Sequence, residues 1–93
     1  MANNLLTVTL SSEEVIQLKE AVSEDEVLLS DINSFETDSR GRLILELELE
    51  TAEILREYLT RQLAKVGFDK AYAPTKKGVI LETMIDKFYT ARP

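Results

Sequence analysis

The chain has 93 residues, of which 44% are hydrophobic and 30% charged, and its 17 acidic and 11 basic residues give a net charge of −6. This length accommodates a single domain, 1–93, and the apolar content is that of a folded domain rather than of a disordered chain. The acidic balance argues against binding to nucleic acid or to anionic membrane surfaces, because both depend on clusters of Lys and Arg.

Several residue types that carry protein chemistry are missing. The chain has no cysteine and no histidine, which excludes disulfides, thiolate nucleophiles, metal sites built on these ligands and the commonest general base near neutral pH. It also lacks a P-loop, a G-x-S-x-G motif and other catalytic signatures. We therefore expect a protein that is not an enzyme and that has no cofactor.

The sequence predicts a cytoplasmic protein without membrane contact. No apolar run approaches the length of about 18 residues that a membrane span requires. The first residues, MANNLLTVTLSS, contain no basic region of the kind that opens a signal peptide. The absence of cysteine agrees with a reducing compartment.

The first predicted element is a strand over residues 5–10. Apolar and polar side chains alternate in LLTVTL, which is the period of a strand with one buried face. The next stretch, SSEEVIQLKEAV, predicts a helix. Ser11 and Glu14 have the spacing of a capping box, and apolar residues recur every three or four positions.

A second capping pattern, Ser23 with Glu26, opens the amphipathic stretch EDEVLLSDINSF. This stretch either forms a second helix or continues the first, and the pattern over 12–35 leaves both alternatives open. The segment TDSRGR, at 37–42, then predicts a turn.

Residues 43–50, LILELELE, predict the second strand. Leucines alternate strictly along it and would share one face, while the other face would carry Glu46, Glu48 and Glu50. On a strand these carboxylates would stand about 6.6–7 Å apart. They form a candidate surface for a basic protein partner. The alternative is a solvated face that discourages aggregation between sheet edges.

Two more helices are predicted after this strand. TAEILREYLTRQLAKVG would be capped by Thr51 and would end at Gly67 in a left-handed helix stop. The last helix would follow Pro74, begin at about Thr75 with that residue as its cap, and run to Tyr89.

These elements predict a small α+β domain in which a two-stranded sheet packs against three or four helices. Two strands alone are marginal. Pairing of the sheet with that of a second copy would extend it, and we therefore expect a homo-oligomer, in the simplest case a dimer.

The stretch VGFDKAYAPTKKGVILETMID contains a second candidate site. Asp69 and Tyr72 fall in the connection between the last two helices, where either a structural joint or a site for a peptide or small ligand is possible. Gly78 would weaken the helix relative to Ala, so close packing against it is expected. Glu82 and Asp86 are like charges at i,i+4, a mildly unfavourable pair unless a Lys, Arg or hydroxyl lies opposite, and Tyr72 is the expected partner of one of them.

At these residues the chain resembles a group of small bacterial proteins that have no established activity. In that group a capped helix ends in VGFD, followed by a tyrosine, a Pro-Thr or Pro-Asn cap, a glycine and LE..ID. The resemblance covers residues 43–89 and implies a fold and a bacterial origin, but no function. The chain departs from the group at Ala71 and Lys77, where acidic residues are common, which weakens the idea of an acidic metal cluster. The matching residues are Val66, Gly67, Phe68, Asp69, Tyr72, Pro74, Thr75, Gly78, Leu81, Glu82, Ile85 and Asp86.

The expected function is that of a non-catalytic protein-interaction or regulatory module that acts as a homodimer. Two alternatives stay open. The first is an immunity-type antidote that binds a basic toxin. The second is a metal- or small-ligand-binding protein that uses Asp69, Glu82 and Asp86.

Overall fold

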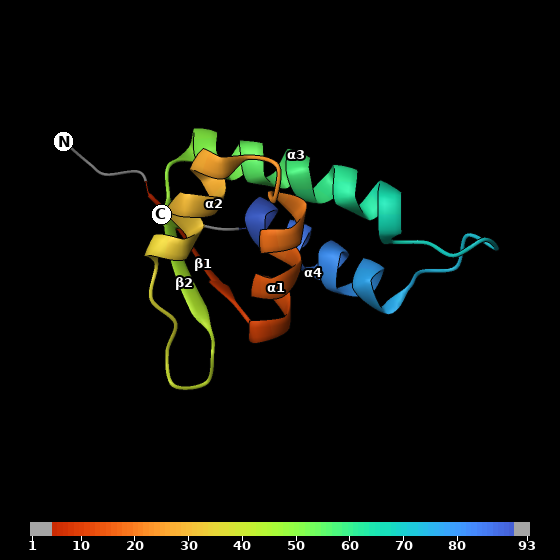
Figure 1. Ribbon diagram of the computed structural model, residues 1–93, viewed down its shortest axis with the longest axis horizontal. Coiled ribbons are helices and arrows are strands. Elements are labelled where there is room, and N and C mark those ends of the chain that lie inside the picture. Colours follow the sequence, from red (N-terminus) through yellow and green to blue (C-terminus); the bar gives the residue numbers. More distant parts are fainter. Residues whose placement is uncertain (1–4, 91–93) are drawn as a thin grey trace.

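The computed structural model describes residues 5–90, in which two β–α–α units follow each other along the chain (Figure 1). The first four residues, MANN, lie outside the described residues. The predicted absence of a signal peptide depends partly on them. The predicted α+β class, with a two-stranded sheet and helices packed on it, is confirmed. The elements are β1 (Leu6–Leu10), α1 (Ser12–Ala21), α2 (Glu26–Ser34), β2 (Leu43–Leu47), α3 (Leu49–Val66) and α4 (Lys76–Thr90).

β1 and β2 form an antiparallel sheet with one buried face and one exposed face. Leu6 pairs with Leu47 and Leu10 pairs with Leu43, so the apolar residues of both strands share the buried face. The helices therefore cover only one side of the sheet, as the alternating sequences predict. The exposed face carries Thr7, Thr9, Ile44 and Glu46.

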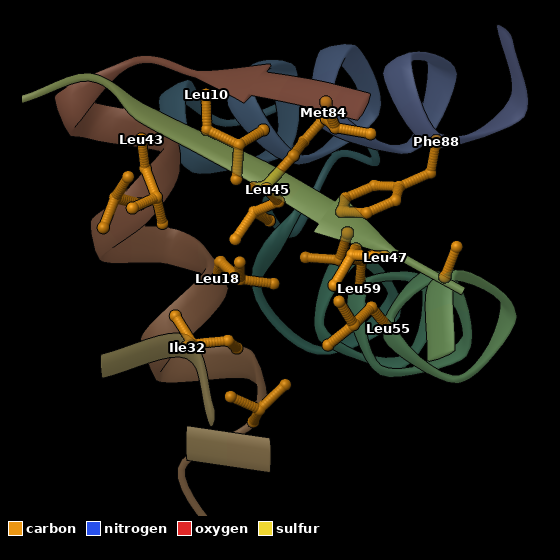
Figure 2. Close-up of a cluster of buried hydrophobic side chains, with 14 of the residues drawn as sticks. Leu10, Leu18, Ile32, Leu43, Leu45, Leu47, Leu55, Leu59, Met84 and Phe88 are labelled. Atoms are coloured by element: carbon orange, nitrogen blue, oxygen red, sulfur yellow. The ribbon is translucent and has the colours of Figure 1, made fainter. Parts of the chain in front are cut away.

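The hydrophobic core lies between the inner face of the sheet and the helices (Figure 2). Leucines of β2 approach Leu18 of α1 and the α3 residues Leu55 and Leu59, and Met84 and Phe88 of α4 complete the cluster. Each of these five helical side chains is at most 2% exposed. Burying one side chain of this size stabilises a fold by about 1.5–3 kcal/mol relative to exposure, so this cluster is the main stabilising feature.

Glu14 connects three elements. It forms the predicted capping box: its amide donates to the Ser11 hydroxyl (3.2 Å), and its carboxylate accepts from the Ser11 amide (2.8 Å). The same carboxylate accepts from the Lys87 ammonium of α4 (2.5 Å), which also donates to the Thr9 carbonyl of β1 (3.0 Å). Because Glu14 is only 5% exposed, this contact with Lys87 compensates a charge removed from water.

α1 and α2 are separate helices, which resolves the alternatives left by the sequence. The predicted cap of the second helix, Ser23 with Glu26, is wrong. The cap is Asp25, whose carboxylate accepts from the Leu28 amide (3.0 Å). Val22 accounts for the shift: it is fully buried, and its carbonyl accepts from the Asp25 amide (2.9 Å), which fixes the turn before α2.

A hydrogen bond from α3 fixes the start of α2. The Tyr58 hydroxyl donates to the second carboxylate oxygen of Asp25 (2.9 Å). Hydrogen bonds lower the pKa of Asp25, because they stabilise its ionised form. The bond from the Leu28 amide has the larger effect, and the bond from the Tyr58 hydroxyl adds to it. The same bond raises the pKa of Tyr58.

The second strand is shorter than predicted and ends at Leu47. Glu48 is the N-cap residue of α3 and makes no side-chain capping bond, so the predicted cap at Thr51 is wrong. Leu49 is 56% exposed instead of buried. The buried stripe of α3 starts at Ala52, in the first turn of the helix, and acidic side chains in a first turn are favoured by the helix dipole.

Candidate functional site: the loop between α3 and α4

Residues 67–75, called here the α3–α4 loop, project from one end of the molecule (Figure 1). An antiparallel bridge pairs Phe68 with Pro74 across the loop. Next to it, the Asp69 amide donates to the Ala73 carbonyl (2.9 Å). The loop is therefore closed by backbone pairing, and its tip has a defined conformation.

Asp69 has a structural task in this loop. Its carboxylate oxygen Oδ1 accepts hydrogen bonds from the amides of Ala71 (2.8 Å) and Ala73 (3.0 Å). The Tyr72 amide donates to the Asp69 carbonyl (3.0 Å) and completes a tight turn. An aspartate that bonds backbone amides ahead of it in the chain is a common device for fixing turns.

The same arrangement occurs between α2 and β2. There, Oδ1 of Asp38 accepts from the amides of Arg40 (2.8 Å) and Arg42 (2.9 Å), and the Gly41 amide donates to the Asp38 carbonyl (3.0 Å). The Asp38 amide donates to the Arg42 carbonyl (2.9 Å). Hydrogen bonds from Arg42, above all from its backbone amide, lower the pKa of Asp38. Each backbone bond has a counterpart at the same spacing in the α3–α4 loop.

The two loops differ at the residue that adopts a positive φ. In the first loop this residue is Gly41, with a φ of 76°, and in the α3–α4 loop it is Tyr72, with a φ of 61°. Glycine adopts this conformation without steric cost, whereas a side chain meets the neighbouring carbonyl. Among the described residues Tyr72 is the one non-glycine residue with a positive φ, and it is 87% exposed.

Two glycines at the base of the loop allow α3 and α4 to approach closely. A Cβ atom at Gly78 would lie 2.1 Å from the Gly67 carbonyl oxygen, so the expected close packing at Gly78 is confirmed. The left-handed stop expected at Gly67 is wrong, because its φ is −78°. The Thr75 amide donates to the Gly67 carbonyl (2.8 Å), and the Thr75 hydroxyl accepts from the Gly78 amide (3.0 Å), as predicted for a cap.

The remaining predicted residues of this segment do not assemble into a ligand site. Glu82 and Asp86 are exposed on α4, and the predicted pairing of Tyr72 with them is wrong because Tyr72 lies in the loop with its ring in solvent. Asp69 is held by loop amides instead. Within residues 5–90, no three acidic side chains come close enough together to hold a metal ion.

The three predicted partner-binding glutamates do not form a continuous face either. Glu46 lies on the exposed face of the sheet, Glu48 is the N-cap of α3 and Glu50 is in the first turn of that helix. The alternation stops at Leu47, so the spacing expected for one strand does not apply. The positions of Glu48 and Glu50 are explained by the helix dipole alone.

Sequence reasoning missed the exposed residues that surround Tyr72. Lys70 is exposed in the loop, Lys76 is exposed at the start of α4, and Phe68 at the base of the loop is 42% exposed. The available signal was local: the loop and its flanks are rich in lysine, although the whole chain is acidic.

No protein-family model, curated protein or solved structure matches this chain. The resemblance over residues 43–89 therefore stays a prediction. No helix within the described part of the chain is long and apolar enough to cross a membrane.

Proposed function

We propose that the chain is a cytoplasmic, non-catalytic protein-interaction module that contacts its partner through the α3–α4 loop. The observation that carries this proposal is Tyr72, which is 87% exposed and held at a positive φ. This conformation costs a non-glycine residue about 1–2 kcal/mol. An exposed ring recovers little of that cost within the fold. Backbone strain of this kind concentrates at ligand-binding positions, and tyrosine is enriched among the residues that dominate protein–protein binding.

The loop has two further properties of a contact surface. Its conformation is fixed by the Asp69 carboxylate and by the bridge between Phe68 and Pro74, so little order has to be gained on binding. The exposed part of Phe68 adds apolar area at the base of the tip. A rigid aromatic residue on a preorganised loop is suited to insert into a pocket of a partner.

The test is a selection of short random peptides displayed on phage against the wild-type protein. Selected peptides are labelled, and their dissociation constants are measured by fluorescence anisotropy for Tyr72→Ala and Tyr72→Gly. Alanine keeps a side chain at the strained φ but removes the ring, whereas glycine removes both. We expect both variants to weaken binding about tenfold or more, as the loss of an anchoring aromatic residue does.

The matched control is Tyr89→Ala. Tyr89 is also an exposed tyrosine (64%), but it lies on α4, where it stacks on Arg56. This variant should bind the selected peptides like the wild type. Peptides that bind Tyr72→Ala as well as the wild type, or that depend on Tyr89 instead, would contradict the use of the α3–α4 loop.

Self-association is the second part of the proposal, and the short sheet supports it. Among the described strands, β1 and β2 pair only with each other. Thr37 bridges to Leu43 at the start of β2, so the outer edge of that strand is partly covered. The outer edge of β1 is contacted at one end, where the Lys87 ammonium donates to the Thr9 carbonyl, and the exposed face of this strand carries Thr7 and Thr9. Pairing of β1 with β1 of a second copy would give a four-stranded sheet.

A further inference from the structure

Charge is distributed unevenly along the chain. Residues 61–77 contain five basic residues and one acidic residue, whereas residues 24–57 contain eleven acidic and three basic residues. The α3–α4 loop lies at one end of the longest dimension of the molecule, 49 Å, and α2 and β2 lie toward the other (Figure 1). The Debye length at physiological ionic strength is about 8 Å. A partner at the loop therefore meets the local positive charge and not the net charge of the chain.

Three of the basic side chains near the loop have acidic neighbours within the fold. The Lys77 ammonium lies 3.6 Å from the Glu20 carboxylate. Arg61 and Lys65 line a hollow that Glu20 and Glu24 also line. The ion pair offsets the charge of Lys77, and the hollow places Arg61 and Lys65 beside acidic residues, so these three side chains contribute less to a partner at the tip.

Lys70 and Lys76 are different. Both are exposed, and neither forms an ion pair in the part of the chain that the structure describes. Lys70 lies inside the closed loop, two residues before Tyr72, and Lys76 is the first residue of α4, just beyond the bridge between Phe68 and Pro74. The acidic residue nearest to Lys70 along the chain is Asp69, whose carboxylate already accepts two backbone hydrogen bonds.

From this arrangement we infer that the partner segment at the α3–α4 loop is an acidic stretch of a protein, an assignment that rests on the proposed use of this loop. One carboxylate of the partner pairs with Lys70 in the loop and another with Lys76 at the start of α4, while Tyr72 inserts into an apolar pocket of the partner. The basic partner expected from the sequence has no assembled glutamate face to bind, because Glu46, Glu48 and Glu50 are divided between a strand and a helix. Complementary charge at the loop favours the opposite sign.

An acidic protein segment fits this surface better than a nucleic acid does. Proteins that bind DNA tightly make about 6–10 phosphate contacts, and most of their affinity depends on them. Two lysines without ion pairs provide far fewer. A long polyanion would also extend from the loop toward the acidic remainder of the chain, whereas a short acidic segment needs only the tip.

The test uses the peptides selected on the wild-type protein. We expect their sequences to be enriched in Asp and Glu relative to the library, and their affinity to fall as salt concentration rises. Lys70→Glu should weaken binding about fivefold, the upper range for exposed charge pairs. The matched control is Arg40→Glu, which makes the same change of charge in the equivalent loop between α2 and β2 and should leave the affinity unchanged. Thermal melting of both variants checks that each remains folded.

The outcomes separate this inference from the proposed function. Peptides that depend on Tyr72 but are neutral or basic, or that bind Lys70→Glu as well as the wild type, would overturn the acidic partner and leave the use of the loop intact. A single-stranded DNA oligonucleotide that binds at the loop as tightly as the peptides, and competes with them, would also overturn it. If no selected peptide depends on Tyr72, the proposed function itself fails.

Discussion

At the scale of single residues, Tyr72 and Gly41 form an internal comparison. They occupy equivalent positions in two loops with the same hydrogen bonds and similar positive φ values of 61° and 76°. The chain uses glycine where the loop has only to turn. In the α3–α4 loop it keeps a tyrosine whose side chain is 87% exposed, which is the difference expected if the ring has a task outside the fold.

This comparison predicts that Tyr72→Gly stabilises the protein. Relief of the left-handed strain raises the free energy of unfolding by about 1–2 kcal/mol. The greater freedom of glycine in the unfolded chain lowers it by about 0.5–1 kcal/mol. We expect a net gain of up to about 1.5 kcal/mol in urea denaturation. Tyr72→Ala should stay near the wild type, because the ring is 87% exposed.

The matched substitution in the other loop is Gly41→Ala. It should destabilise the protein by about 1–2 kcal/mol, because it introduces the same strain and places a Cβ atom 3.2 Å from Cβ of Ser12. A loss of stability in Tyr72→Gly would show that the ring stabilises the fold itself. The argument that Tyr72 is retained for binding would then fail.

Asp25 gives a prediction about pH. Its pKa in the folded protein is lowered by the Leu28 amide and the Tyr58 hydroxyl. A lowered pKa means that its contribution to stability is present above its ordinary pKa of about 3.8 and is lost as pH falls through the folded value. Tyr58→Phe should therefore raise the pKa of Asp25, measured by NMR of the carboxyl carbon, and should destabilise the protein at pH 7 more than below about pH 3.8.

The control for this pH effect is Asp25→Asn. Asparagine keeps an acceptor for the Leu28 amide but does not titrate. Its stability should therefore vary less with pH than that of the wild type between neutral and acidic solution. If the free energies of unfolding of Tyr58→Phe and the wild type differ by the same amount at every pH, the hydrogen bond does not act through the charge of Asp25.

At the scale of elements, the pairing of α3 with α4 depends on the contact between Gly67 and Gly78. Alanine normally favours a helix over glycine by about 1 kcal/mol. Here a Cβ atom would lie 2.1 Å from a backbone carbonyl oxygen, which can move only if the helices separate. We therefore expect Gly78→Ala to destabilise the protein by about 1–3 kcal/mol in urea denaturation. Thr83→Ala, at an exposed position of the same helix, should change stability by less than about 0.5 kcal/mol.

The boundaries of the elements show how far local patterns reach. Both strands and the capping box of α1 follow from alternation and spacing, because one face of each element meets the core. The position at which β2 ends does not follow from the local pattern. In LELE, the glutamates suit a solvated strand face and the first turn of a helix equally well. The choice depends on the burial of Ala52, a tertiary contact.

The location of the candidate site could be predicted from the sequence, but its structure and the residues exposed on it could not. The stretch around Asp69 stood out through its glycines and its proline, and the structure confirms a joint with a close helix contact at Gly78. Its resemblance to the Asp38 loop was hidden, because the glycine that marks TDSRGR as a turn is replaced by Tyr72. A positive φ at a tyrosine is imposed by the hydrogen bonds of the whole loop and has no signature in the residue itself.

At the scale of the whole molecule, net charge is a poor guide to the charge that a partner meets. The value of −6 averages a lysine-rich end and an acidic end that lie far apart compared with the screening length. The sequence-based expectation of a basic partner rested on this acidic balance and on three glutamates that would share one strand face. The folded arrangement places Lys70 in the exposed loop, leaves Lys76 exposed at the start of α4, and divides the three glutamates among different elements.

The dimer is predicted to form through β1 and to be sensitive to charge there. Thr7 is exposed, and in an antiparallel pair of β1 strands it would lie close to the symmetry axis, where threonines are good cross-strand neighbours. Thr7→Lys would bring two like charges together, and lysine is the residue with which natural edge strands prevent pairing. Light scattering over a range of concentrations should show a dimer for the wild type and a folded monomer for Thr7→Lys.

The control is Glu46→Lys, which introduces a lysine on the same face of β2 and should still dimerise. A wild-type chain that stays a folded monomer up to high micromolar concentration would rule out this pairing, because the two-stranded sheet would then be sufficient with its own helices.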